Sequence, residues 1–511
     1  MSHQFPPGGP GGPGGSHLPP PPPQQPYSYP SPYAQPQVWG QVPQGPPPPP
    51  PGKQGGGGLK GAVIGVVVLA VLAVFGLGGL AVFKAVGSDS LPSAAGGDKQ
   101  AQELLSQQDI KSLLQGRTDA LKNGDEDAYL SVFAGKAKTT QEKLYRNLRK
   151  VPFTQAEFSV LSQEGSGKDE FGDGVSVAVD VAFVHRIKNV DVRPIAEWYR
   201  WVVKRESADA EPEITSVGPA PTMYGSGTFV YYPAPWDLYD DMYVKSGAHS
   251  IVIADKKNAS NAARYAPYME QAADYDLGLW KQLDQPQTDT PKGFMLVLEP
   301  DRKKYAKLWN SGGEDVGWDA GQAVPMPAFD ESSSADSTDG LQWGGSRIKM
   351  DTSTSRFTSA SYWQMGVTDI SRHEMAHALV EPLDHGDYTF GGAGGAKTWI
   401  VEGFANYVAY RGNSTLSSAR IGSTVSGEEF DGALPKDDFG DQSPRSISMN
   451  YTLSYLAIRY IAEKGGEKAA FDFVVDNYEK PKQLDTSLQS AVGMDTTQFQ
   501  SSWAAYVRSV S

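Results

Sequence analysis

Cysteine is absent from this chain of 511 residues, which excludes disulfide bonds, thiolate metal sites and a cysteine nucleophile. An excess of positive charge is absent too, since the formal net charge is −14. A chain without a basic field has little affinity for nucleic acid, so no nucleic-acid partner is predicted. Histidine is scarce, with seven in the whole chain. The pair His373 and His377, four positions apart, is therefore the first specific feature.

The first 60 residues are poor in the apolar side chains that a folded core needs. Runs such as Pro46–Pro51 favour the extended polyproline II conformation, and Gly55–Gly58 is flexible. We therefore predict a disordered Pro/Gly-rich tail over residues 1–60 that acts as a solvated spacer. The alternative is a docking segment for a proline-recognising partner.

Residues 61–83 contain no charged or strongly polar side chain. At about 1.5 Å per residue, a helix of this length reaches about 35 Å, enough to cross a bilayer core. The stretch is too long and too far from the N-terminus for a signal peptide. We predict a single transmembrane helix at 61–83, followed by a polar linker at 84–100. Lysines without acidic residues on the N-terminal side predict a single-pass protein of the cell membrane, with the N-terminus cytoplasmic and the remainder extracytoplasmic.

Residues 101–217 carry helix signals followed by strand signals. A helix is predicted from Gln107 to Leu121, with a stop at the helix-ending pair Asn123-Gly124, and Asp125 is predicted to cap the next short helix. Strict alternation of apolar residues predicts a strand over Val175–Phe183. This order, with the phrase "ALKNGDEDAYLSVF", resembles the SnoaL-like, cystatin-type α+β cone fold. No convergent His/Asp pair is present, so we expect a binding or spacer role. His185 is expected to be an ordinary strand residue.

Residues 222–511 are predicted to form one larger domain whose second half is mostly helical. The predicted fold class of the chain is α+β, with a single transmembrane helix, a small cystatin-like domain and this larger domain. The elements expected in its first half are strands near Thr228–Tyr232, Ser250–Ala254, Phe294–Glu299 and Arg347–Met350, and a helix near Ala259–Leu283.

The sequence His373-Glu374-x-x-His377 has the spacing of a metal site on a helix. Residues at i and i+4 lie on one helix face, so both imidazoles can reach one ion. Zinc binds nitrogen and oxygen ligands tetrahedrally, and a catalytic site leaves one position to water. Glu374 stands beside the first ligand, where a carboxylate can act as general base. Asp369 is predicted to cap this helix.

The third ligand distinguishes between families of such sites. A metzincin pattern requires glycine and histidine where this chain has Val380 and Leu383. The segment Trp399–Tyr407, which reads Trp-Ile-Val-Glu-Gly-Phe-Ala-Asn-Tyr, instead closely resembles the glutamate helix of gluzincin zinc metallopeptidases. This resemblance implies a gluzincin-type peptidase domain with zinc held by His373, His377 and Glu402, and with Glu374 as general base and proton shuttle.

Further roles follow only from the resemblance. Asn406 lies one turn after Glu402 and is expected to orient a ligand histidine. The segment after Asn450 resembles the following helix of the peptidase MA-like branch, in which the first tyrosine faces the metal. This implies Tyr451 as the donor to the oxyanion, with Tyr455 as the second choice and core packing as its other interpretation.

Two further features of the sequence also have candidate roles near the metal motif. Arg347–Met350 resembles the edge strand that pairs with extended substrate in this family. His385 is interpreted as a loop histidine, or else as a donor on the substrate side.

The resemblance also bears on the type of activity. The 24 residues between His377 and Glu402 fit the peptidase MA-like branch. The Gly-x-Met-Glu-Asn stretch of aminopeptidases is absent, so an endopeptidase that cleaves peptides or proteins is expected. The predicted function is a membrane-anchored zinc metallopeptidase. The alternative is a catalytically latent, zinc-containing binding or sensing module at the cell surface.

Overall fold

The computed structural model describes most of the chain from residue 105 onward. The described residues are 105–168, 175–207, 209–219, 231–309, 319–329, 342–384, 395–412, 418–425, 430–435, 439, 444–481 and 483–511. All of them belong to one compact unit, Lys60–Ser511. The predicted tail, transmembrane stretch and linker (1–60, 61–83 and 84–100) lie outside the described residues.

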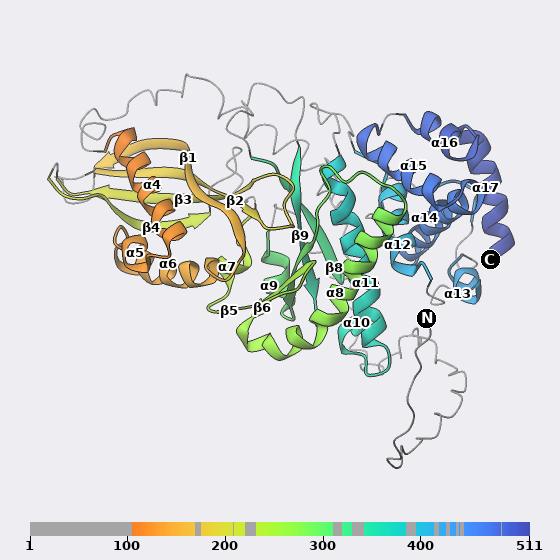
Figure 1. Cartoon of the computed structure of the whole chain (residues 1–511), viewed down its shortest axis with the longest axis horizontal. Helices are drawn as coiled ribbons and strands as arrows, with labels where there is room; N and C mark the ends of the chain where they lie inside the picture. Colours follow the sequence, from red (N-terminus) through yellow and green to blue (C-terminus); the bar gives the residue numbers. More distant parts are fainter. Residues whose placement is uncertain are drawn as a thin grey trace, which may run out of the picture. The chain divides into compact units, whose positions relative to one another are not determined.

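The first described part is a small α+β unit, in which helices pack on a four-stranded antiparallel sheet of order β1-β2-β3-β4 (Figure 1). The first helix ends as predicted, because Gly124 adopts the left-handed conformation with φ 75°. The side chain of Asp125 then caps the next helix. The elements are α4 (Gln107–Asn123), α5 (Glu126–Leu130), α6 (Gly135–Leu148), β1 (Phe153–Lys168), β2 (Val175–Ile187), β3 (Ile195–Arg205) and β4 (Glu213–Pro219).

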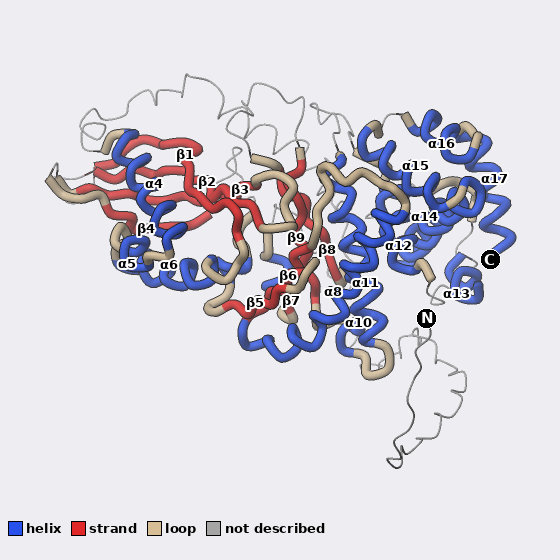
Figure 2. The backbone as a smooth tube through the Cα atoms, viewed as in Figure 1, coloured by secondary structure: helices blue, strands red, loops and turns tan. Residues whose placement is uncertain are grey.

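The larger part begins with a mixed five-stranded sheet of order β5-β6-β7-β9-β8, drawn in red near the centre of Figure 2. Strands β6, β7 and β9 are parallel, while β5 and β8 run antiparallel at the two edges. The elements are α7 (Pro235–Leu238), β5 (Met242–Ser246), β6 (Ser250–Asp255), α8 (Ala259–Gln282), β7 (Phe294–Glu299), α9 (Arg302–Lys307), β8 (Gly321–Pro327) and β9 (Trp343–Asp351).

A helical half follows the sheet and completes the larger part (Figure 1). Its elements are α10 (Ser355–Thr358), α11 (Trp363–Val380), α12 (Thr398–Tyr410), α13 (Ser418–Val425), α14 (Pro444–Gly465), α15 (Glu467–Glu479), α16 (Leu484–Val492) and α17 (Thr496–Val510). The predicted strand Thr228–Tyr232 lies largely outside the described residues.

The predicted fold class, α+β with a single transmembrane helix, is wrong. The described part of the chain is a mixed α/β structure, because α8 connects β6 to β7 and brings these two strands into parallel pairing. The sequence placed all three elements, but their order was not interpreted as a crossover unit. Within the described ranges, no helix combines the length and the apolar character needed to cross a bilayer.

The five-stranded sheet is buried on both faces. Alternate residues of β6 belong to different cores: Ile251 and Ile253 join the core of the small α+β unit, whereas Val252 and Ala254 join the core of the helical half. A strand covered on both faces is apolar throughout rather than alternating, which explains the continuous apolar run of β6. The small unit is therefore one of the two layers that cover this sheet.

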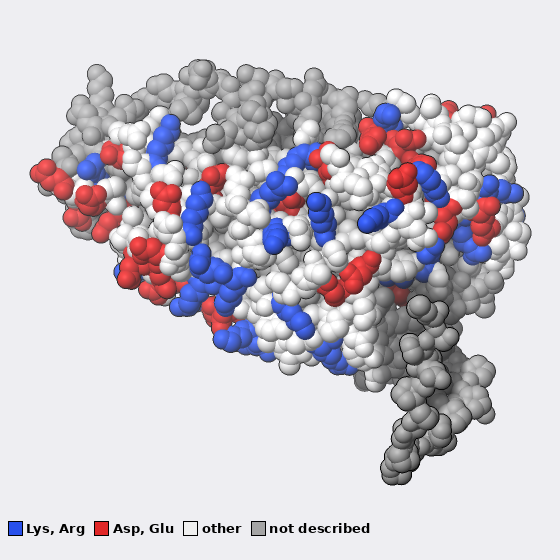
Figure 3. Space-filling model, viewed as in Figure 1, with Lys and Arg blue, Asp and Glu red and all other residues white. Residues whose placement is uncertain are grey.

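Polar contacts also connect the small unit to the larger part. The buried amide of Asn147 donates to the carbonyls of Trp236 and Tyr239, and its oxygen accepts from the N–H of Met242. Basic and acidic side chains are interspersed over the face of the molecule that Figure 3 shows. Exposed ion pairs contribute about 0–1 kcal/mol each, so the buried contacts are the stronger connection.

Candidate metal centre

Helix α11 carries the His-Glu-x-x-His segment and lies between α8 and α12. It begins at Trp363 with Tyr362 at its N-cap position. The prediction that Asp369 caps this helix is therefore wrong, because Asp369 lies inside it. Because the helix begins six residues before Asp369, the two histidines lie in its C-terminal half. Most residues of this helix are buried. The surrounding core restricts the orientation of the two histidines.

His373, His377 and Glu402 come together as the sequence predicts. The Nε2 atoms of His373 and His377 are 3.2 Å apart, and they lie 3.4 and 3.6 Å from Oε2 of Glu402. This is the one possible metal-binding group of three or more such side chains found among the described residues. Glu402 is 3% exposed and its Oε2 accepts no hydrogen bond of normal geometry there.

These residues fit a zinc ion. Tetrahedral ligands at about 2.0–2.1 Å from zinc are separated from each other by about 3.3–3.4 Å. The three ligand-atom separations in this group bracket that value. Two imidazole nitrogens and one carboxylate oxygen are also a donor set that zinc prefers.

The charges of the group are strongly coupled. Burial alone would raise the pKa of Glu402, but His377 and His373 outweigh it and lower that pKa to about 2. Burial would likewise lower the pKa of His377, yet the carboxylates of Glu402, Glu374 and Glu381 raise it to about 9. The carboxylate of Glu402 is thus ionised, and either a protonated histidine or a metal ion can balance its charge.

Gly403 explains how a third helix reaches the group. A Cβ atom at this position would lie 2.5 Å from the carbonyl oxygen of Ser454, so only glycine permits the close approach of α12 and α14. That approach brings Tyr451 of α14 beside the histidines, with its ring centroid 6.5 Å from that of His373.

The two candidate tyrosines have different surroundings. Burial, followed by the carboxylates of Glu402 and Glu374, raises the pKa of Tyr451 well above its ordinary value. Its hydroxyl therefore keeps its proton and can donate a hydrogen bond. Tyr455 instead packs in the core against the rings of Tyr407 and Tyr410. Of the two, Tyr451 is the tyrosine that lies beside the metal ligands.

Asn406 makes a different contact from the one expected. Its side-chain amide donates a hydrogen bond to the main-chain carbonyl of Tyr451 over 3.5 Å. The contact connects the helix of Glu402 to the helix of Tyr451. This contact bears on the position of Tyr451, and the expected role of Asn406 toward a ligand histidine stays a prediction.

Glu374 is held by a strand that the sequence analysis missed. Its Oε2 accepts a hydrogen bond from the N–H of Ala323 in β8 at 2.9 Å. Burial raises the pKa of Glu374 above its ordinary value, although His373 and His377 offset part of this effect. Two prolines lie in β8, at 325 and 327. Proline within a strand is confined to sheet edges, so this signal could have identified the edge strand.

The prediction that Arg347–Met350 forms the edge strand is wrong. These residues lie in β9, which pairs with β7 on one side and with β8 on the other. The side chain of Arg347 is fully buried. The edge of the sheet next to the metal group is therefore β8.

Glu381 was also missed, although it stands four positions after His377 on the same helix face. Its carboxylate accepts a hydrogen bond from the hydroxyl of Ser346 in β9. Burial is the largest influence on Glu381 and raises its pKa to about 7. Glu381 thus adds a carboxylate four positions after His377, a member of the possible metal-binding group.

The two other histidines of the described residues, His185 and His249, lie elsewhere. His185 is buried in the small unit, where burial and the cation of Arg347 hold its pKa well below the ordinary value. His249 faces the carbonyl oxygen of Lys292. His385 lies outside the described residues.

No family model matches this chain, and no curated protein matches it. Membership in the gluzincins therefore stays a prediction.

Proposed function

We propose that this protein is a zinc-dependent metallopeptidase that cleaves internal bonds of peptides or proteins. The observation that carries the proposal is the triangle of His373, His377 and Glu402 ligand atoms, with Glu374 and Tyr451 beside it. A zinc ion bound there polarises a peptide carbonyl and lowers the pKa of water.

Glu374 is the proposed general base. It accepts a proton from the attacking water and passes it to the nitrogen of the leaving amine. Burial makes this carboxylate a stronger base than an exposed glutamate, because it raises the pKa. The hydrogen bond from Ala323 occupies Oε2, which leaves Oε1 to take the proton.

Tyr451 is the proposed donor to the oxyanion that develops on the substrate carbonyl. Its raised pKa keeps the hydroxyl protonated, and a donor fixed in place needs no reorganisation during the reaction. Strand β8 offers an edge along which an extended peptide can form main-chain hydrogen bonds. The substrate would then lie across the helix that carries Glu374.

The test is cleavage of a mixed peptide library by the purified chain, before and after removal of metal with a chelator. We expect cleavage within peptides, its loss on chelation and its return with one equivalent of zinc. One bound zinc per chain without any cleavage would contradict the peptidase and support the alternative, a latent zinc-containing binding module.

A further inference from the structure

A buried ion pair joins the small α+β unit to the sheet that borders the metal group. Asp191 lies between β2 and β3, and its two oxygens are 2.6 and 3.0 Å from the two terminal nitrogens of Arg347 in β9. Both side chains have no exposed surface. Oδ2 of Asp191 also accepts from the N–H of Ile187.

His185 completes the surroundings of this pair. Its Nδ1 faces the carbonyl of Phe183 at 3.1 Å and must carry the proton, so Nε2 accepts from Arg347 at 3.3 Å. Burial and the adjacent guanidinium lower the pKa of this histidine, which keeps it neutral. A buried, bidentate pair of this kind has one favoured geometry.

The residues around Asp191, Val190–Ile195, are named the clamp segment here. The N–H groups of Val192 and Arg193 both donate to the carbonyl of Gly344, at 2.8 and 3.1 Å. Pro194 accepts from the N–H of Phe329 at 2.7 Å, just after β8 ends. The clamp segment therefore binds both the end of β8 and the start of β9.

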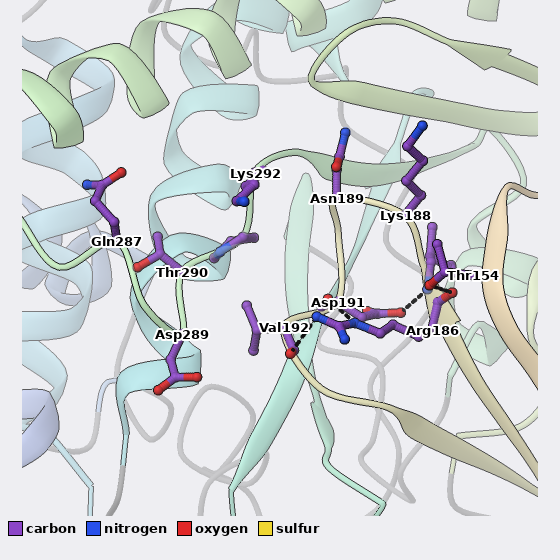
Figure 4. A pocket seen from close by; sticks show the side chains of 12 residues that line it. Thr154, Arg186, Lys188, Asn189, Asp191, Val192, Gln287, Asp289, Thr290 and Lys292 are labelled. Atoms are coloured by element: carbon purple, nitrogen blue, oxygen red, sulfur yellow. Dashed lines mark hydrogen bonds between the residues drawn. The ribbon is translucent and has the colours of Figure 1, made fainter.

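The other side of the clamp segment borders a cavity. Asp191 and Val192 line a cavity of about 420 Å³ between the end of β2 and the loop before β7. Figure 4 shows Gln287, Asp289 and Thr290 on the facing loop. On this side the guanidinium of Arg186 donates to the carbonyls of Asp191 and Val192, and Arg193 pairs with Asp289. These contacts act together with the buried ion pair and the main-chain bonds to hold the segment in place.

A short path leads from the ion pair to Glu374. Arg347 is the register partner of Val324 in β8, and the preceding residue, Ala323, donates to the Glu374 carboxylate. Strand β8 has β9 as its strand neighbour on one side and lies at the sheet edge on the other. Its position is therefore set by β9 and by the clamp segment, together with helix α11, against which it packs.

We propose that Asp191 and Arg347 are positioning residues for the reaction: through β9 and β8 they fix the orientation of the Glu374 carboxylate. This inference rests on the proposed peptidase function. It makes the small α+β unit part of the catalytic apparatus, rather than a separate ligand-binding domain.

The test uses variants of the full chain that keep it folded. Asp191→Asn combined with Arg347→Met removes both charges of the pair, and the amide oxygen of the asparagine can still accept from the N–H of Ile187. Gly344→Ala is an independent variant, because its Cβ would lie 2.3 Å from Ile195 and push the clamp segment away. Asp180→Asn is the control, since it breaks another bidentate pair, with Arg200, between β2 and β3.

Three quantities are measured: zinc per chain, steady-state kinetics, and hydrogen exchange of the amides in residues 319–329. In both test variants we expect one zinc, faster exchange at Ala323, and kcat lower by about tenfold to a hundredfold with KM changed by less than about twofold. The control should resemble the wild type in all three.

A double variant with wild-type kcat and wild-type exchange at Ala323 would overturn the proposal and leave the pair a structural contact. If the wild type cleaves no peptide but exchange at Ala323 rises in both test variants, the link to β8 stands and the peptidase proposal fails. The two failures are therefore distinguishable.

Discussion

The main-chain N–H of Ala323 donates a hydrogen bond to Oε2 of Glu374 over 2.9 Å. Two residues earlier, Gly321 packs against the same carboxylate, since a Cβ at that position would lie 2.8 Å from Oε1. A strand thus fixes a side chain that belongs to helix α11. The proposed active site depends on this strand and on helices α11, α12 and α14, and each contribution can be tested by substitution.

Glu402→Gln should lower the affinity for zinc by more than about a hundredfold, because substitutions of groups outside the ligand set already cost about 10–100-fold. Bound zinc also stabilises the fold, so chelation should lower the unfolding temperature of the wild type more than that of the variant. Competition with a chromogenic chelator measures the affinity. Glu463→Gln, which breaks an exposed ion pair with Arg459 in α14, is the control. Equal affinities of Glu402→Gln and the wild type would refute Glu402 as a ligand.

Tyr451→Phe should lower kcat by about 100–1000-fold, the usual cost of removing one oxyanion donor. KM should change little, because the hydroxyl acts in the transition state. Tyr455→Phe is the matched control, since that ring packs against Tyr407 and Tyr410 in the core. Steady-state kinetics measure both variants. Similar kcat values for the two would exclude Tyr451 as the donor.

Gly403→Ala should lower the free energy of unfolding by about 1–3 kcal/mol, because the added methyl group meets Ser454 and overpacks the contact of α12 with α14. Gly278→Ala is the control within a helix, since nothing lies within 4 Å of its Cβ position. The control should stabilise the fold by about 0.5–1 kcal/mol. Denaturant unfolding measures both, and stabilisation by Gly403→Ala would contradict the described packing.

Asp237→Asn should remove part of the pH dependence of stability. Burial raises the pKa of Asp237 to about 7, although Ala234 and Tyr199 oppose this through hydrogen bonds. A carboxyl whose folded pKa is raised stabilises the fold at low pH, and this contribution falls between about pH 4 and 7. The free energy of unfolding should fall by less than about 1.4 kcal/mol per pH unit in this range, since Asp237 is only half-buried. Unfolding curves at pH 5 and pH 8 measure it, and identical pH dependence in both proteins would contradict the assignment.

Local patterns in the sequence predicted individual elements well. Gly124 and Asp125 mark the end and start of neighbouring helices, and both act as expected, because a left-handed glycine and a carboxylate cap are determined within a few residues. The fold class was missed because it depends on how distant strands pair. The sequence alone did not show that β6 and β7 are parallel or that the small unit covers their sheet.

The metal group was predicted because helical spacing brings His373 and His377 together and a second motif supplies Glu402. Contacts between elements far apart in the chain were not predicted. Ala323 is 51 positions from Glu374, and Asp191 is 156 positions from Arg347. No periodicity connects such residues, so only the folded arrangement reveals them.

The most direct test of the central claim compares the wild type with Glu374→Gln, each loaded with one zinc per chain, on the same peptide library. The account predicts that the wild type cleaves within peptides, while the variant binds zinc equally, unfolds at a similar temperature and cleaves nothing detectable. Full cleavage by Glu374→Gln would contradict the proposed general base and, with it, the mechanism.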